Sequence, residues 1–413
     1  MRKIISGRRP TPKGDFIFEI NARNVDGVSS PIDVFELPIT TPTSGGLVAF
    51  EVDWGDGTSN NLNAASSFSH TYSPTDPTYP NYTVRIRGSL RGWQFTAPSA
   101  GSRDQVKLDR ILQWGCFRVT NPRTFEGCQQ FTAIAASDTP IFEYDMSGGG
   151  GLNRMFKDCV ALTTINSIDN WDVSILKSTS AMFDRCLKWE FGSGGLAPDL
   201  SKWKVNNVAD FSFMFAQCSL FDGIMFDSVT SNANDTRSMF SRAVVFDAAG
   251  SDIQISKWDM SNVSNMRFMF SGANAFNRNI TGWNTGSCAN MTNMFAGNNG
   301  IAMQFNQAIG AWDTSSVTNL NNIFTLCNSF DQDLSNWNLN SIATFSNVTP
   351  PLTQPLGSFG LSTANYDALL VAWDAYTYPN IPANSTWNFG SSQYSLGSAA
   401  ETARTSLINK WGG

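Results

Sequence analysis

Two stretches of the chain repeat one pattern, WDMSNVSNMRFMF at 258–270 and WNTGSCANMTNMF at 283–295. Each begins with Trp and ends with Phe twelve positions later. Taken with that last Phe as the anchor, eight copies occur, spaced 25 to 32 residues apart. Repeats of this length predict a stack of similar units. The anchors are Phe125, Phe156, Phe183, Phe215, Phe240, Phe270, Phe295 and Phe324.

Each repeat carries more large apolar side chains than it can bury alone. A second apolar residue, usually Phe, stands six positions after the anchor, and the best copies add an aliphatic residue and a Trp. Because a unit of about 25 residues has no core of its own, the copies must share a continuous one. We therefore expect a ladder of buried rings as the main source of stability. Besides the anchors, the ladder contains Trp171, Trp203, Trp258, Trp283, Trp312 and Trp337.

Spacing within a repeat predicts its local structure. Val263, Met266, Phe270 and Ala273 recur every three to four positions, as on a short amphipathic helix. The alternating segment NITGW at 279–283 predicts a short strand. One strand, one turn and one short helix per repeat make an α/β repeat solenoid.

The seven cysteines fit this repeat rather than a disulfide framework. Most stand three positions after an anchor, where Ala243 and Ala273 stand in other copies. Exchange with alanine indicates a small buried position, in which a free thiol packs as an apolar group. No CxxC pair occurs, so a zinc site is not expected. We also expect no cofactor, and we assign no residue as a metal ligand.

The segments before the repeats predict an antiparallel β-sandwich, because DFIFEI, LVAFEVDWGDGTS and YTVRIRGSL alternate apolar and polar residues. Asp53 and Asp56 lie in its DWGDGT turn, without the following Glu of a calcium loop. Whether they bind calcium stays open. His70, the single histidine, is expected to brace the sandwich.

The sequence divides into four parts: a basic arm at 1–15, the sandwich at 16–100, the repeats at 101–349 and a C-terminal cap at 350–413. Two apolar stripes, in STANYDALLVAWDAY and GSAAETARTSLINKW, predict that the cap consists of two helices. They would cover the last repeat.

Charge is placed unevenly along the chain. The arm is basic, whereas residues 279–403 contain no Lys or Arg and the net charge is −6. This balance argues against nucleic-acid binding. The arm is either a solvated tail or a segment that docks on an acidic partner, and we favour docking. Its basic residues are Arg2, Lys3, Arg8, Arg9 and Lys13.

No secretory signal and no transmembrane run are visible in the sequence. We therefore expect synthesis in the cytoplasm without membrane insertion.

Four motifs together resemble the BspA-like leucine-rich-repeat surface proteins. They are F-x2-C-x2-F, the unit WDTSSVTNLNNIF, the segment VDWGDG…HTY of a polycystic-kidney-disease-type (PKD-like) domain, and the closing LSTANYDALLVAWDAY. The resemblance implies a leucine-rich-repeat-like solenoid after an all-β PKD-like sandwich. It also implies adhesion or recognition at bacterial surfaces, and similar proteins are encoded by bacteriophages. Enzymatic activity is not implied.

Combined with the absence of a signal, the resemblance predicts a non-enzymatic phage virion surface protein of the capsid-decoration or fibre type. The arm and sandwich would attach to other virion proteins of the capsid or tail, while the solenoid stabilises the particle or contacts host surface glycans or proteins. A bacterial cell-surface adhesin is the alternative, and homo-oligomerisation stays open. Asp172, Asp259 and Asp313 follow Trp in their repeats, so we interpret them as turn residues rather than catalytic acids.

Overall fold

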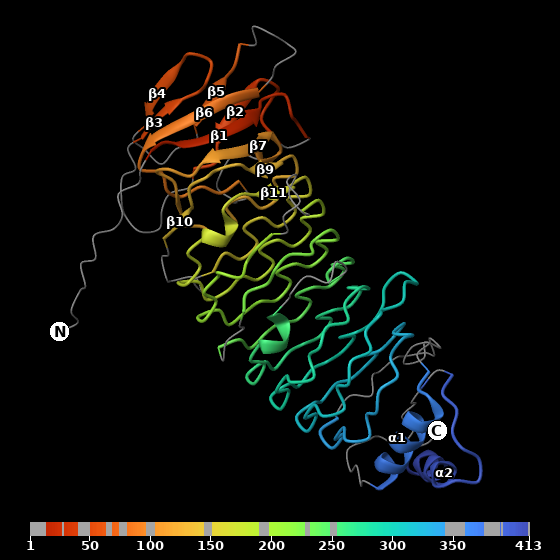
Figure 1. Cartoon of the computed structure of the whole chain (residues 1–413). Coiled ribbons are helices and arrows are strands. Elements are labelled where there is room, and N and C mark those ends of the chain that lie inside the picture. Colours follow the sequence, from red (N-terminus) through yellow and green to blue (C-terminus); the bar gives the residue numbers. More distant parts are fainter. Residues whose placement is uncertain are drawn as a thin grey trace, which may run out of the picture. The chain divides into compact units, whose positions relative to one another are not determined.

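The computed structural model in Figure 1 divides into two compact units. The N-terminal unit comprises Met1–Met146 and Ile165–Ser167, and the C-terminal unit comprises Ser147–Thr164 and Ile168–Gly413. The five basic residues of the predicted arm lie outside the described residues. The structure describes residues 14–26, 29–39, 50–62, 68–73, 81–95, 104–143, 151–189, 198–227, 232–247, 254–342, 360–375, 389 and 391–411.

The N-terminal unit is built on an antiparallel sheet around β1 (Phe16–Asn21), which pairs with β6 (Asn81–Gly88) and β7 (Leu108–Gln113). Burial alternates along β1, as the sequence pattern predicts. The sheet order is β11-β9-β7-β1-β6-β3-β4, and two smaller sheets are β2-β5 and β10-β8. The remaining strands are β2 (Val34–Leu37), β3 (Phe50–Asp53), β4 (Ser59–Leu62), β5 (Phe68–Thr71), β8 (Arg118–Val119), β9 (Ala133–Ile134), β10 (Ile141–Phe142) and β11 (Thr164–Ile165).

The sheet extends into the sequence that we assigned to the repeats. β7 lies after residue 100 and pairs with β1 in antiparallel fashion, then with β9 in parallel. The first anchor, Phe125, also packs in the N-terminal unit, 6.1 Å from the ring of Trp114 and 5.7 Å from that of Phe131. Without β7, strand β1 would lie at the edge of the sheet with unpaired N–H and C=O groups. Pairing with β7 satisfies these groups.

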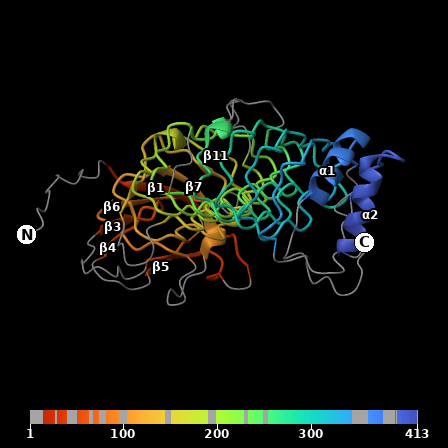
Figure 2. The ribbon, with the colours of Figure 1, turned by 90° about the horizontal axis from the view of Figure 1, so that it is seen from below.

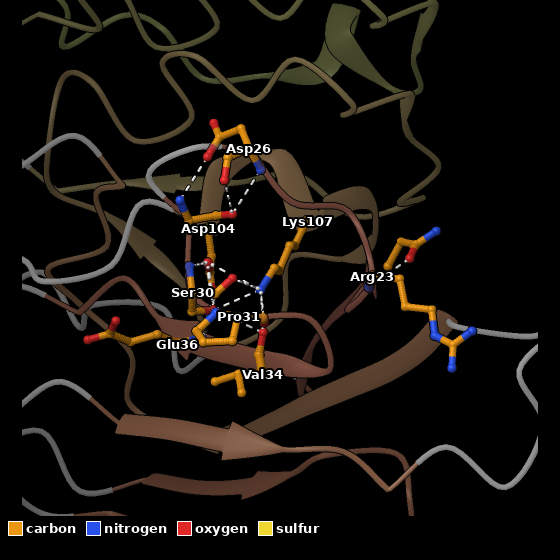
Figure 3. A network of polar contacts seen from close by, with 10 residues as sticks. Arg23, Asp26, Ser30, Pro31, Val34, Glu36, Asp104 and Lys107 are labelled. Atoms are coloured by element: carbon orange, nitrogen blue, oxygen red, sulfur yellow. Dashed lines mark hydrogen bonds and ion pairs between the residues drawn. The ribbon is translucent and has the colours of Figure 1, made fainter.

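A buried charged network fixes the start of β7 (Figure 3). Asp104 and Lys107 lie at the ends of a 3-10 turn, both fully buried, 3.5 Å apart. The Lys107 ammonium donates to the main-chain oxygens of Ser30 and Val34, and the Asp104 carboxylate accepts from the N–H groups of Ser30 and Glu36. These bonds compensate two desolvated charges, although burial still lowers the pKa of Lys107.

In the C-terminal unit, successive repeats lie side by side, joined by parallel bridges (Figures 1 and 2). The bridges run through the residue five positions before each anchor, in the order Gly151, Ser178, Asp210, Asp235, Asn265, Asn290 and Asn319. Each anchor N–H also donates to the carbonyl just before the next anchor, for example Phe270 to Met294 at 3.0 Å. Every repeat is thus held in register with the next.

The anchor rings of this unit form one stack. From Phe156 to Phe324 neighbouring centroids are 5.6 to 6.0 Å apart, with interplanar angles of at most 9°. The rings six positions later form a second stack, and Phe305 keeps its place 3.9 Å from Phe295 despite a four-residue insertion. All eight anchors and all six Trp residues of the predicted ladder are buried. The Trp side chains also bond between repeats, since the indole N–H of Trp283 donates to Ile255 and that of Trp312 to Ile280.

Local structure within the repeats differs from the expectation. Residues 266–272 form consecutive turns, not a helix, and 279–283 contains a turn in which Asn279 accepts from the N–H of Thr281, not a strand. The buried positions are nevertheless those of the predicted stripe. Short 3-10 turns occur at Asp104–Lys107, Ile168–Asn170 and Gln254–Lys257.

Two helices follow the repeats where the apolar stripes predict them, α1 (Thr363–Ala375) and α2 (Ala399–Trp411). They pack on each other, and Lys410 pairs with Asp374 at 2.7 Å. The residue before α1, Ser362, donates its N–H to Asp331 of the last repeat at 2.8 Å. The helices therefore begin directly against the final repeat.

Candidate binding surface

Each anchor is the centre of an eight-residue segment, from four positions before it to three after, which we call the anchor segment. In the segment around Phe270, Met266, Met269, Phe270 and Ala273 point inward and are fully buried. Of the positions between these pairs, Arg267 is exposed, Phe268 and Ser271 are half-buried, and Gly272 is buried. We call the set of these intervening positions in all repeats of the C-terminal unit the outer face. Some of its small residues, such as Ser212 and Ala216, are themselves buried.

Alternating hydrogen bonds create this arrangement. In the Phe270 segment the N–H groups of Phe268 and Gly272 donate to the next repeat, while those of Met269 and Ser271 donate within the turn. Phe268 and Gly272 have positive φ angles of 57° and 74°. The same two positions, two before and two after the anchor, are left-handed in most repeats of the unit. The N–H groups along the outer face are therefore already used by the fold itself.

Most outward positions carry small polar side chains, but three neighbouring repeats differ. Phe213 and Phe268 occupy the position two before the anchor, where other copies have Ala181, Asn293 or Asn322. Phe213 is 38% exposed and Phe268 is half-buried, whereas the anchor rings are fully or almost fully buried. Three arginines accompany these rings. The aromatic–arginine patch consists of Phe213, Arg237, Arg242, Arg267 and Phe268.

The arginines are placed over the rings and across the repeats. The guanidinium of Arg237 lies 5.6 Å from the ring centre of Phe213, and that of Arg267 lies 4.8 Å from the ring centre of Phe268, both within cation–π range. The stem of Arg242 crosses to the next repeat, since a Cβ on Gly272 would lie 3.3 Å from its Cγ. The patch is thus one continuous surface over three repeats.

The patch is positively charged. Arg237 pairs with Asp235 at 3.3 Å, whereas within the described part of the chain neither Arg242 nor Arg267 takes part in an ion pair. Burial raises the pKa of Asp235, and nearby Asp210 adds to the rise, although Arg237 opposes it. Two guanidinium groups therefore face solvent without a carboxylate partner from the described residues.

The acidic side chains of the repeats serve as turn residues. The carboxylates of Asp172, Asp259 and Asp313 each accept the N–H two positions on, at 2.9 to 3.1 Å. Hydrogen bonds from Ser261 and Ser315 lower the pKa of Asp259 and Asp313, respectively. Acids held in this way serve the chain's own turns.

The Asp-rich turn of the N-terminal unit is likewise occupied by internal partners. Asp53 accepts the N–H of Gly55, and Asp56 accepts from Thr58 and contacts His70 Nε2 at 2.7 Å. The His70 ring stacks on Trp54 at 4.7 Å, so it links β5 to the turn after β3. Burial acts to raise the Asp56 pKa, but the bonds from Thr58 and His70 outweigh it and lower the pKa. Among the described residues no group of three His, Cys, Asp or Glu could hold a metal ion.

All seven cysteines are buried and none is in a disulfide, as the exchange with alanine predicts. Those in the repeats donate to carbonyls, for example Cys186 to Phe156 at 3.2 Å and Cys218 to Phe183 at 2.9 Å. Burial raises the pKa of the Cys288 thiol to about 11 and those of Cys186, Cys218 and Cys327 further. Such thiols are unreactive at neutral pH.

The sequence patterns did not predict the aromatic–arginine patch. The repeat alignment held the signal, since Phe213 and Phe268 stand in a column otherwise filled by Arg154, Ala181, Ser238, Asn293 and Asn322. The column indicates a surface patch only if it is known to belong to the outer face. The predicted helix did not show which way the column faces.

Comparison with known proteins gives one match. The family model described as "Mycoplasma protein of unknown function, DUF285" matches residues 101–192, 123–253 and 244–350, which together cover more than half of the 413 residues. No curated protein and no solved structure matches the chain. Within the described residues, no helix is both long and apolar enough to span a membrane.

Proposed function

We propose that this chain, which belongs to the DUF285 family, is a non-enzymatic surface protein whose repeats form a solenoid that presents its outer face to a partner. The three overlapping family matches are consistent with a BspA-like repeat surface protein. One observation carries the proposal: buried positions are nearly uniform from repeat to repeat, whereas outward positions vary. A scaffold of constant interior and variable exterior is the basis of recognition by repeat proteins.

The location that we propose is the surface of a phage virion, as a capsid-decoration or fibre-type component. In this proposal the N-terminal sandwich is a PKD-like domain, and it attaches to the particle together with Arg2, Lys3, Arg8, Arg9 and Lys13. The unlike charge of the two ends supports this division, since the arm is basic and residues 279–403 contain no Lys or Arg. An adhesin on the bacterial cell surface is the alternative.

Antibodies raised against the C-terminal unit distinguish these locations. They should label intact purified virions, and deletion of residues 2–14 should release the protein from the particles while its circular dichroism stays unchanged. Labelling of intact bacterial cells and not of virions would instead establish the adhesin. Undiminished attachment of the truncated chain would contradict the role of the arm, and hydrolysis of a bound glycan by the purified protein would contradict the non-enzymatic assignment.

A further inference from the structure

We infer that the aromatic–arginine patch binds a carboxylated polysaccharide that lies along the stack of repeats. This inference rests on the proposed function, because it names the class of ligand for the same outer face. Three observations carry it: the strained backbone at Phe213 and Phe268, the charge of the patch, and the backbone hydrogen bonds that the fold already uses.

Phe213, which is exposed, and Phe268, which is half-buried, both occupy strained backbone positions. Phe213 and Phe268 have φ angles of 58° and 57°, a left-handed conformation that bulky residues rarely adopt and Asn adopts readily. Asn293 and Asn322 fill the same position in later repeats, also with positive φ. The fold therefore does not need Phe there, and an exposed aromatic ring retained at a strained position is typical of a binding surface.

The two rings are spaced as a linear ligand requires. Phe213 and Phe268 belong to repeats that are two apart, with Ser238 at the same position between them. Parallel pairing at about 4.8 Å per repeat separates them by roughly 10 Å, comparable with the length of a disaccharide. The C–H faces of sugar rings pack on aromatic rings, whereas the nearby hydroxyl of Ser271 and amide of Asn293 can bond sugar hydroxyls.

Charge selects an acidic ligand. Arg242 and Arg267 have no ion-pair partner among the described residues, and guanidinium groups bind carboxylates through two parallel hydrogen bonds. Since residues 279–403 contain no Lys or Arg, the later repeats offer an acidic polymer no comparable site. A neutral polymer would gain no charge-assisted hydrogen bonds from the arginines.

Backbone hydrogen bonding argues against an acidic peptide as the ligand. Extended peptides usually bind by adding a strand to a free edge. Around the patch, the N–H groups of Ser238, Phe240 and Arg242 donate to the next repeat and those of Met239 and Ser241 donate within the turn. With these donors consumed, the outer face offers side chains only, which suits a polysaccharide.

The test uses the purified full chain with polygalacturonate, and with the same polymer fully methyl-esterified as a matched neutral probe. Calorimetry should detect binding of polygalacturonate that weakens as salt increases, and none of the ester. The pair Arg242→Gln with Arg267→Gln, and the pair Phe213→Asn with Phe268→Asn, should each weaken binding roughly tenfold. The Asn pair should unfold at the same or a higher temperature, because Asn relieves the strain.

Lys204→Gln is the control, since it removes an exposed charge outside the anchor segments and should change affinity by less than about twofold. Equal binding of the ester, full displacement by polyglutamate, unchanged affinity in both variant pairs, or no binding of polygalacturonate would each overturn the inference. None of these outcomes affects the antibody labelling, so failure of the ligand class and failure of the surface location remain distinguishable.

Discussion

At the residue scale, position in the anchor segment decides what a phenylalanine does. Phe270 is fully buried and stacks on Phe240 and Phe295 at 5.6 and 5.9 Å. Phe268, two positions earlier, faces outward with a positive φ. One ring stabilises the stack, and the other is available to a partner.

Truncating these two kinds of ring should have very different effects. Phe270→Ala removes a ring from a column with neighbours on both sides, so we expect a loss of about 3 to 5 kcal/mol in the free energy of unfolding. Phe213→Asn should change it by less than about 1 kcal/mol. Urea unfolding followed by fluorescence measures both. Equal losses in the two variants would contradict the assignment of inward and outward positions.

At the element scale, the repeats use turns where the pattern predicts a helix. An eight-residue segment is too short to hold a helix by its own hydrogen bonds, and alternate N–H groups gain more by bonding to the next repeat. Side chains supply a second link between the later repeats, at the residue that directly follows the second ring of each repeat. There each Asp or Asn accepts the N–H of the equivalent residue in the next repeat, in the series Asp222, Asp247, Asn277, Asn306 and Asp331.

Removal of one acceptor from this series should loosen the repeat that follows. Asn306 Oδ1 accepts from the N–H of Asp331 at 2.9 Å and from Gln332 at 2.8 Å. Asn306→Ala should therefore cost about 1 to 3 kcal/mol and accelerate hydrogen exchange at the Asp331 amide. Asn306→Asp keeps a side-chain oxygen at this position, just as the Asp331 carboxylate accepts the N–H of Ser362. The Asp331 amide should therefore still exchange slowly in this variant. Fast exchange in both variants would show that the side-chain acceptor is not what protects that amide.

At the scale of the whole molecule, both units are held by packing and hydrogen bonds without covalent links among the cysteines. The seven thiols are buried and unpaired with one another. A reductant should therefore leave the thermal unfolding temperature of either unit unchanged, and thiol reagents should label the protein only after denaturation. Calorimetry with and without dithiothreitol, together with labelling before and after denaturation, checks this. A lower unfolding temperature in the reduced sample would reveal a disulfide and overturn the packing role.

The same packing explains which parts of the candidate surface the sequence predicts. The repeated Phe, Trp and Cys columns mark the interior, because burial of large apolar groups imposes the same residue at the same position in every copy. The outer face imposes no such requirement, so its residues vary and carry no periodic signal. Phe213 and Phe268 consequently resemble core residues in the sequence. Their column holds Arg, Ala, Ser or Asn in the other repeats, but only the structure shows that this column belongs to the outer face.

The sequence by itself determined that the chain is a stack of similar units, which residues are buried, where the two C-terminal helices lie and that the cysteines are not bridged. Only the tertiary structure decided the rest: turns in place of the helix and strand of each repeat, β7 joined to the N-terminal sheet, and the buried pair Asp104 and Lys107. The physical reason is that burial leaves a local periodic trace in the sequence. Hydrogen bonds between repeats and between distant strands depend on which segments meet, and no local pattern records that.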